Sequence, residues 1–163
     1  MSKIAPYLWF DSEAEKATNF YVSLLSNSHI DQVQRNVTDS PAGKAGTVLT
    51  IAFTLTDQRF LALNSGTRFE YTPAISFMVV VDRLWDALSD GGAPNRCGWL
   101  KDRYGVSWQI VPIVLPKLLG DRDPVKAQRV MEAMLQMSKL DIAALEAAHA
   151  GHLHDLTTTG ELR

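Results

Sequence analysis

A β-α-β-β-β order of elements occurs twice along this chain, and this repeat limits the fold more than any other feature of the sequence. The first series covers residues 4–10, 12–25, 29–37, 47–55 and 60–64. The second series is shortened by tighter connections, and the four elements that can be placed in it cover residues 74–81, 82–88, 97–101 and 106–111. Phe10-Asp11 before the first helix matches Val81-Asp82 before the second. Two such units predict an α+β fold in which a pair of curved sheets encloses a cleft.

The spacing of apolar residues separates helix from strand within the first series. Ser12 and Glu15 fit a capping box at a helix start. Apolar side chains then recur at helical spacing: Ala14, Ala17, Phe20, Tyr21, Leu24 and Leu25. Residues 47–55 instead alternate between apolar and polar, and Asp57-Gln58 predicts a tight turn into the strand at 60–64. The first series is therefore expected to hold one helix with a buried face and a β-hairpin.

The composition is that of one ordinary globular protein. With 163 residues, 46% of them hydrophobic and 21% charged, the chain can bury a substantial core. A net charge of -2 gives no electrostatic reason to expect nucleic acid or an anionic membrane as partner. Cys97 is the single cysteine, so no intrachain disulfide is expected and a reducing compartment is favoured. Without a signal-like or membrane-spanning stretch, the expected location is cytoplasmic.

The last third of the chain differs in kind from the repeat. Asp123-Pro124 marks a helix start, and Asp141 caps a second helix. An apolar stripe runs along the first of these helices: Ala127, Val130, Met131, Met134, Leu135 and Met137. It is either an adaptable binding surface or, in the simpler interpretation, a packing face. We therefore expect paired modules over 1–64 and 74–112 in one domain spanning 1–112, helices of the same domain over 113–148, and a flexible tail over 149–163.

Several segments resemble one known family. They are PYLWFDSEAEKATNFYVSLLSNS, FLALNSG, AISF, CGWLKDRYGVSWQIVP and DPVKAQRVMEAMLQMSKLDIAALEAA, and they cover nearly the whole chain to about Ala148. In these segments the chain resembles the PhnB-like branch of the vicinal oxygen chelate, or glyoxalase-like, superfamily, which often carries the name 3-demethylubiquinone-9 3-methyltransferase. The resemblance implies paired βαβββ modules, a homodimer and sites near the module junctions. It implies no particular reaction.

The positions at which this superfamily binds metal carry poor ligands here. Metal-dependent relatives hold a divalent ion with His or Glu side chains from the first and last strands of each module, and the ion acts as a Lewis acid. The matching positions are Ile4 or Ala5, Ala62, Ala74 or Ser76, and Gln109. Gln109, in the closing hairpin, offers an amide where a carboxylate is usual. We therefore expect neither a metal nor another cofactor.

The same positions outline a cleft for a small organic molecule. We predict that it is lined by Tyr7, Trp9, Asn64, Ser76, Met78 and Gln109. An apolar surface with a few amide and hydroxyl groups is typical of such pockets. The alternative is that these side chains fill the sheet interior and satisfy one another. If the cleft is catalytic, Tyr7 is the acid–base candidate.

Other chemically capable residues favour structural interpretations. His149, His152 and His154 are spaced by three and two residues, which does not place them on one helix face, so solvated histidines are favoured over a metal cluster. Cys97 has no histidine near it in sequence, so a small buried residue is favoured over a nucleophile. Trp99 and Trp108 lack surrounding basic residues, so core or interface positions are favoured over nucleic-acid stacking.

Three functional hypotheses follow from this sequence. The first is a metal-independent enzyme, such as a lyase or isomerase, acting on a small polar metabolite. The second is a binding protein that sequesters a drug or metabolite, and the third is an interaction protein whose C-terminal helices matter. A methyltransferase with a Rossmann fold is disfavoured, because no glycine-rich turn follows an apolar strand.

Overall fold

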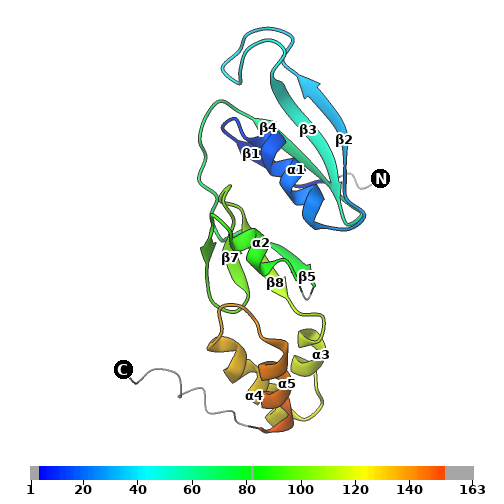
Figure 1. Ribbon diagram of the computed structural model, residues 1–163, viewed down its shortest axis with the longest axis vertical. Helices are drawn as coiled ribbons and strands as arrows, with labels where there is room; N and C mark the ends of the chain where they lie inside the picture. The colour runs from blue at the N-terminus through cyan, green and yellow to red at the C-terminus, as the bar shows by residue number, and fades with distance from the viewer. Residues whose placement is uncertain (1–3, 82, 153–163) are drawn as a thin grey trace. The chain divides into compact units, whose positions relative to one another are not determined.

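The computed structural model describes residues 4–81 and 83–152 (Figure 1). The chain forms two compact units, Met1–Tyr71 (unit 1) and Thr72–Arg163 (unit 2). Each unit holds a four-stranded sheet, with strand order β1-β4-β3-β2 in unit 1 and β5-β8-β7-β6 in unit 2. In both sheets the first strand is parallel to the last and the other pairs are antiparallel. The predicted α+β fold with two βαβββ modules is confirmed.

Unit 1 is one βαβββ module with a hairpin at its end. Its elements are β1 (Tyr7–Phe10), α1 (Ala14–Leu24), β2 (His29–Arg35), β3 (Val48–Leu55) and β4 (Gln58–Asn64). The turn between β3 and β4 consists of Thr56 and Asp57, which both have positive φ, one residue earlier than the sequence predicts. Two residues in this conformation match the twist of a β-hairpin.

Helix α1 packs against one face of this sheet, where it forms the core of unit 1 (Figure 1). The helix buries Ala14, Ala17, Thr18 and Tyr21. The sheet contributes Ile51, Phe53, Phe60 and Ala62, and the rings of Phe53 and Phe60 stack with centroids 5.4 Å apart. Small residues on the helix therefore allow a close approach to large side chains on the strands.

Unit 2 repeats the module with a shorter helix and then continues into three helices. The module contains β5 (Phe77–Val80), α2 (Trp85–Ser89), β6 (Ala93–Pro94), β7 (Trp99–Lys101) and β8 (Ser107–Val111). The helices that follow are α3 (Leu115–Leu119), α4 (Pro124–Leu135) and α5 (Ile142–Ala150). Helix α2 buries Trp85 and Leu88, and the sheet buries Leu100 and Trp108. Trp108 therefore belongs to the core, as its sequence context favours.

A buried carboxylate organises the turn of the closing hairpin, between β7 and β8. Asp102 is 3% exposed, and its Oδ1 accepts hydrogen bonds from the backbone N–H groups of Tyr104 (2.9 Å) and Val106 (3.0 Å). Its Oδ2 accepts a third hydrogen bond from Nε1 of Trp108, at 2.8 Å. A buried charge needs such partners. Asp102 in the Asp-Arg-Tyr-Gly turn is therefore structural, because all three bonds lie within the hairpin.

The C-terminal helices pack on one another through a small apolar cluster. Its buried members are Leu115, Leu118, Val130, Leu140 and Leu145, with Met134 and Met137 against them. The predicted caps are confirmed, because the Asp123 and Asp141 side chains accept hydrogen bonds from helix N–H groups. Part of the predicted tail, 153–163, lies outside the described residues, whereas residues 149 and 150 still belong to α5. None of the described helices combines the length and apolar character that a bilayer crossing requires.

Candidate functional site

Each sheet has a second face, opposite its module helix, which we call the open face. In unit 1 the register pairs Leu8 with Ala62 and Phe10 with Asn64 on the helix face. Tyr7 and Trp9 alternate with these residues and lie on the open face, where their partners in β4 are Leu61 and Leu63. The side chains of Tyr7 and Trp9 are 43% and 42% exposed. The structure therefore places both predicted cleft aromatics on an accessible surface.

An aromatic cluster forms around Trp9 on this surface. The Tyr7 ring meets Trp9 edge-on with centroids 6.1 Å apart, and the Phe69 ring meets Trp9 edge-on with centroids 5.5 Å apart. The hydroxyl of Tyr71 donates a 2.7 Å hydrogen bond to the Trp9 carbonyl oxygen. Phe69 is 50% exposed. Phe69 and Tyr71 were not predicted from the sequence, because they lie in a loop without periodicity, although two aromatic residues in RFEYT are a usable signal.

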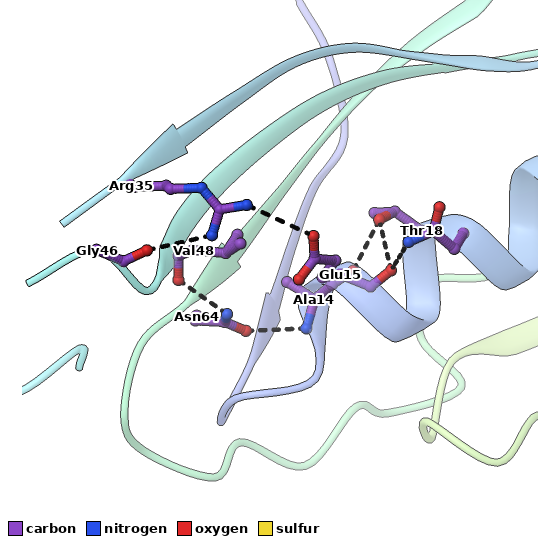
Figure 2. A network of polar contacts seen from close by, with 8 residues as sticks. Ala14, Glu15, Thr18, Arg35, Gly46, Val48 and Asn64 are labelled. Atoms are coloured by element: carbon purple, nitrogen blue, oxygen red, sulfur yellow. Dashed lines mark hydrogen bonds and ion pairs between the residues drawn. The ribbon is translucent and has the colours of Figure 1, made fainter. Parts of the chain in front are cut away.

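Asn64 lies on the other face of the sheet, which corrects the predicted grouping. It is 6% exposed; its Oδ1 accepts a 2.9 Å hydrogen bond from the Ala14 N–H, and its Nδ2 donates to the Val48 carbonyl at 3.0 Å (Figure 2). The predicted capping box is also wrong, because Ser12 makes no side-chain cap and Asn64 satisfies the first N–H of α1 instead. The amide of Asn64 thus joins helix to sheet.

Unit 2 gathers its three predicted residues on its own open face. Gln109 pairs with Met78 on one side and with Trp99 on the other. Its Nε2 donates a 2.8 Å hydrogen bond to the Ser76 hydroxyl oxygen. Met78 is 61% exposed, whereas Gln109, Ser76 and Trp99 are half-buried. The Gln109–Ser76 pair therefore lies between the Met78 thioether and the Trp99 indole, and Trp99 was not predicted to belong to the cleft.

The superfamily's metal positions do not form a ligand set in this chain. Ala62 is fully buried on the helix face, Gln109 offers a neutral amide, and Ser76 offers a hydroxyl. Within residues 4–81 and 83–152, no three His, Cys, Asp or Glu side chains gather in a way that could hold an ion. Divalent transition metals favour imidazole, thiolate and carboxylate donors. The donors present at these positions do not fit the ion that metal-dependent relatives carry.

The histidines near the C-terminus and Cys97 were the other candidates for a metal site or a nucleophile. His149 Nε2 lies 2.8 Å from Asp121 Oδ2, His152 is exposed, and His154 lies outside the described residues. The pKa of Asp121 is held below its ordinary value of 3.8, first by the backbone N–H of Asp123 and then by the hydrogen bond to His149. Cys97 is a free, half-buried thiol in a positive-φ turn. Among the described residues, none of these groups belongs to a cluster that could hold a metal ion.

Comparison with known proteins identifies the family. A sequence model of the 3-demethylubiquinone-9 3-methyltransferase family matches residues 2–111. The chain belongs to this family. It is similar to the PhnB protein from Bacillus cereus, with 36% identity over 68% of this chain and 99% of that one, and a TM-score of 0.62. The predicted PhnB-like, glyoxalase-like assignment is confirmed.

A second solved structure shares the fold, and the family match covers only part of the chain. The PA1353 protein from Pseudomonas aeruginosa shares the fold, with a TM-score of 0.56 and 18% identity over 69% of this chain and 98% of that one. No curated protein matches the chain. The match to the 3-demethylubiquinone-9 3-methyltransferase family model ends at residue 111. Helices α3, α4 and α5 therefore lie outside the matched region.

Proposed function

We propose that this protein binds a small organic metabolite on the open faces of its sheets, without a divalent metal as Lewis acid. The supporting observation is the composition of these faces. Unit 1 presents the Tyr7–Trp9–Phe69 aromatic cluster, and unit 2 presents the Gln109–Ser76 pair beside Met78. Exposed aromatic and thioether groups with a few hydrogen-bonding groups are the usual lining of an organic-ligand site.

Binding is favoured over catalysis by the chemistry of the same residues. An amide, a hydroxyl, a thioether and aromatic rings can hold and orient a ligand, but none of them is an effective base at neutral pH. Tyr7 remains the acid–base candidate for the alternative, a metal-independent lyase or isomerase. A titratable side chain found in contact with a bound ligand would support that alternative, whereas a ligand held by rings and amides alone supports sequestration.

A methyltransferase role is not part of the proposal. The name belongs to the family description, and the described residues of the two βαβββ modules show no strand–glycine turn–helix unit of the kind that binds a dinucleotide-like cofactor. Calorimetry with S-adenosylmethionine is expected to show no heat of binding, and micromolar affinity would reverse this conclusion.

The binding proposal is tested by a thermal-shift screen with a metabolite library, followed by variants. A ligand that binds only the folded state raises the melting temperature. Gln109→Leu removes the open-face amide at nearly constant volume, and Trp9→Leu removes the central ring of the aromatic cluster. Gln128→Leu in α4 and Val37→Ala, both at exposed positions outside the open faces, are the matched controls. Hits that survive both open-face variants and respond to the controls would refute the proposal.

We also propose that the protein is a homodimer, as the resemblance implies. Exposed apolar side chains on the open faces, Trp9 and Met78 among them, support association as well as ligand binding. Sedimentation velocity at micromolar concentration should give the mass of two chains. A monomer under these conditions would contradict the homodimer proposal but not the ligand-binding proposal.

A further inference from the structure

A second candidate site lies in unit 2, away from the open face. A pocket of about 410 Å³ lies among α2, the end of β8 and the α4–α5 connection. Its lining residues are Val81, Arg83, Leu84, Trp85, Asp86, Ala87, Ile110, Pro112, Lys139, Leu140 and Ile142. Both the module and the C-terminal helices contribute. Small-ligand pockets commonly begin near this size.

Pro112, which lines the pocket, stands at the position in unit 2 that matches Asn64 in unit 1. There, Tyr7 pairs with Leu61, and three residues further on Phe10 pairs with Asn64, whose amide joins β4 to α1. In unit 2, Met78 pairs with Gln109, and three residues further on the chain reaches Val81 and Pro112. Pro112 has no side-chain hydrogen-bonding group. Residue 112 therefore supplies no side-chain hydrogen bond like that of Asn64, and Pro112 lines the pocket instead.

The far wall of the pocket is fixed to the module by three contacts. The backbone N–H groups of Cys97 and Gly98 each donate a 2.8 Å hydrogen bond, to the carbonyl oxygens of Met137 and Ser138. Lys139 Nζ lies 3.0 Å from both carboxylate oxygens of Asp86. These bonds hold the α4–α5 connection over the end of the sheet. The wall that carries Lys139 and Leu140 is thus held in place and does not depend on a loose loop.

The lining combines an apolar body with an excess of positive charge. Leu84, Trp85, Leu140 and Ile142 are apolar, whereas Arg83, Lys139 and Asp86 are charged. Asp86 is already paired with Lys139, so the described lining carries one further cation, the Arg83 guanidinium. Leu84 has φ of 100°, a conformation that costs an L-residue free energy and recurs at ligand sites.

We propose that this pocket binds a small organic monocarboxylate, with its apolar body against Trp85 and Leu140 and its carboxylate on Arg83. A guanidinium binds a carboxylate through two parallel hydrogen bonds, which a neutral ligand cannot reproduce. Lys139, Leu140, Ile142 and Pro112 lie beyond residue 111, where the family match ends. The site is therefore a property of chains that carry this helical extension, and it goes beyond the open-face function.

The experiment uses 2-naphthoate as the probe and 2-naphthalenemethanol as its neutral counterpart. Calorimetry gives both affinities, and amide chemical shifts locate the site. We expect naphthoate to bind at least about ten-fold more tightly than the alcohol, or about 1.4 kcal/mol. Arg83→Gln should remove this preference, whereas Arg96→Gln, an exposed arginine of unit 2 outside the lining, should retain it.

Filling the pocket gives an independent result. Ala87→Phe places a ring in the pocket and should abolish binding of both probes while the melting transition remains cooperative. No binding of naphthoate by the unmodified protein, equal affinity for the two probes, or an unchanged preference in Arg83→Gln would each overturn the proposal. Chemical-shift changes confined to Gln109 and its open-face neighbours would do so as well, and would assign the probe to the open face.

Discussion

The junction between the last strand and the module helix is closed differently in the two units. In unit 1 a single buried side chain, Asn64, reaches from β4 to the start of α1. In unit 2 Pro112 stands at the matching position, and the chain continues into helices whose connection is bonded to Cys97 and Gly98. The same sheet topology is thus stabilised at this junction by one side chain in unit 1 and by an additional helical segment in unit 2. In unit 2 a pocket lined by Pro112, Lys139 and Leu140 accompanies the second solution.

The largest expected effect comes from disturbing Gly98, which is hydrogen-bonded to the α4–α5 connection in unit 2. Gly98 has φ of +79°, and an added Cβ would lie 2.6 Å from the Ile110 carbonyl oxygen and 3.0 Å from the Leu140 side chain. Gly98→Ala should lower the free energy of unfolding by about 4 kcal/mol, since backbone strain and overpacking add. Gly46→Ala is the control, because Gly46 has a similar φ of +84° with open space around it.

The control isolates the packing part of this loss. Gly46→Ala should cost only about 1–2 kcal/mol, the backbone term alone. Urea unfolding of both variants measures the difference. Equal losses in the two variants would mean that the close packing of Gly98 against Ile110 and Leu140 does not support unit 2.

Breaking the tie of unit 1 should have the next largest effect. Asn64→Leu keeps the branching and the number of side-chain heavy atoms but leaves the Ala14 N–H and the Val48 carbonyl without their buried partner. We expect a loss of about 2 kcal/mol in the free energy of unfolding. Asn19→Leu, on the exposed side of α1, should change stability by no more than about 0.5 kcal/mol. A similar loss in both variants would show that the Asn64 amide is not the tie.

The sequence predicts the repeat well because its signals are local. Alternation over 47–55 and the Asp123 and Asp141 caps each depend on neighbouring residues, and each is found in the structure. The prediction that Asn64 shares a sheet face with Tyr7 and Trp9 was wrong. Side chains alternate along a strand, so an error of one residue in the register between β1 and β4 moves Asn64 to the other face. The pocket was missed because Gly98 and Ser138 meet only in the folded chain.

A smaller, pH-dependent effect is expected in the helical extension, which unit 1 lacks. The pKa of Asp121 is lowered in the folded state, chiefly by the Asp123 N–H and then by His149. A lowered pKa means that the ionised group stabilises the fold above its ordinary value of 3.8 and loses this contribution as the pH falls through the folded-state pKa. Asp121→Asn should therefore be less stable than the unmodified protein near neutral pH.

This difference should disappear in acid. Unfolding curves collected from about pH 7 to about pH 2 should converge for the unmodified protein and Asp121→Asn. Glu146→Gln, at an exposed position of α5, controls for the loss of one negative charge. A stability difference that persists unchanged at the acid end would assign the effect of Asp121 to packing.

Removal of metal is expected to have no effect on the protein. The matching open-face positions of the two units are Leu61 and Gln109, the partners of Tyr7 and Met78, and neither is a carboxylate. Elemental analysis of untagged protein should therefore find no stoichiometric Zn, Ni, Fe or Mn, and chelator should not shift the melting temperature. Gln109→Glu should behave alike, because one carboxylate beside Ser76 and Met78 does not complete a ligand set. A full equivalent of metal in the unmodified protein, lost on chelation with a fall in melting temperature, would show that other side chains replace the usual ligands.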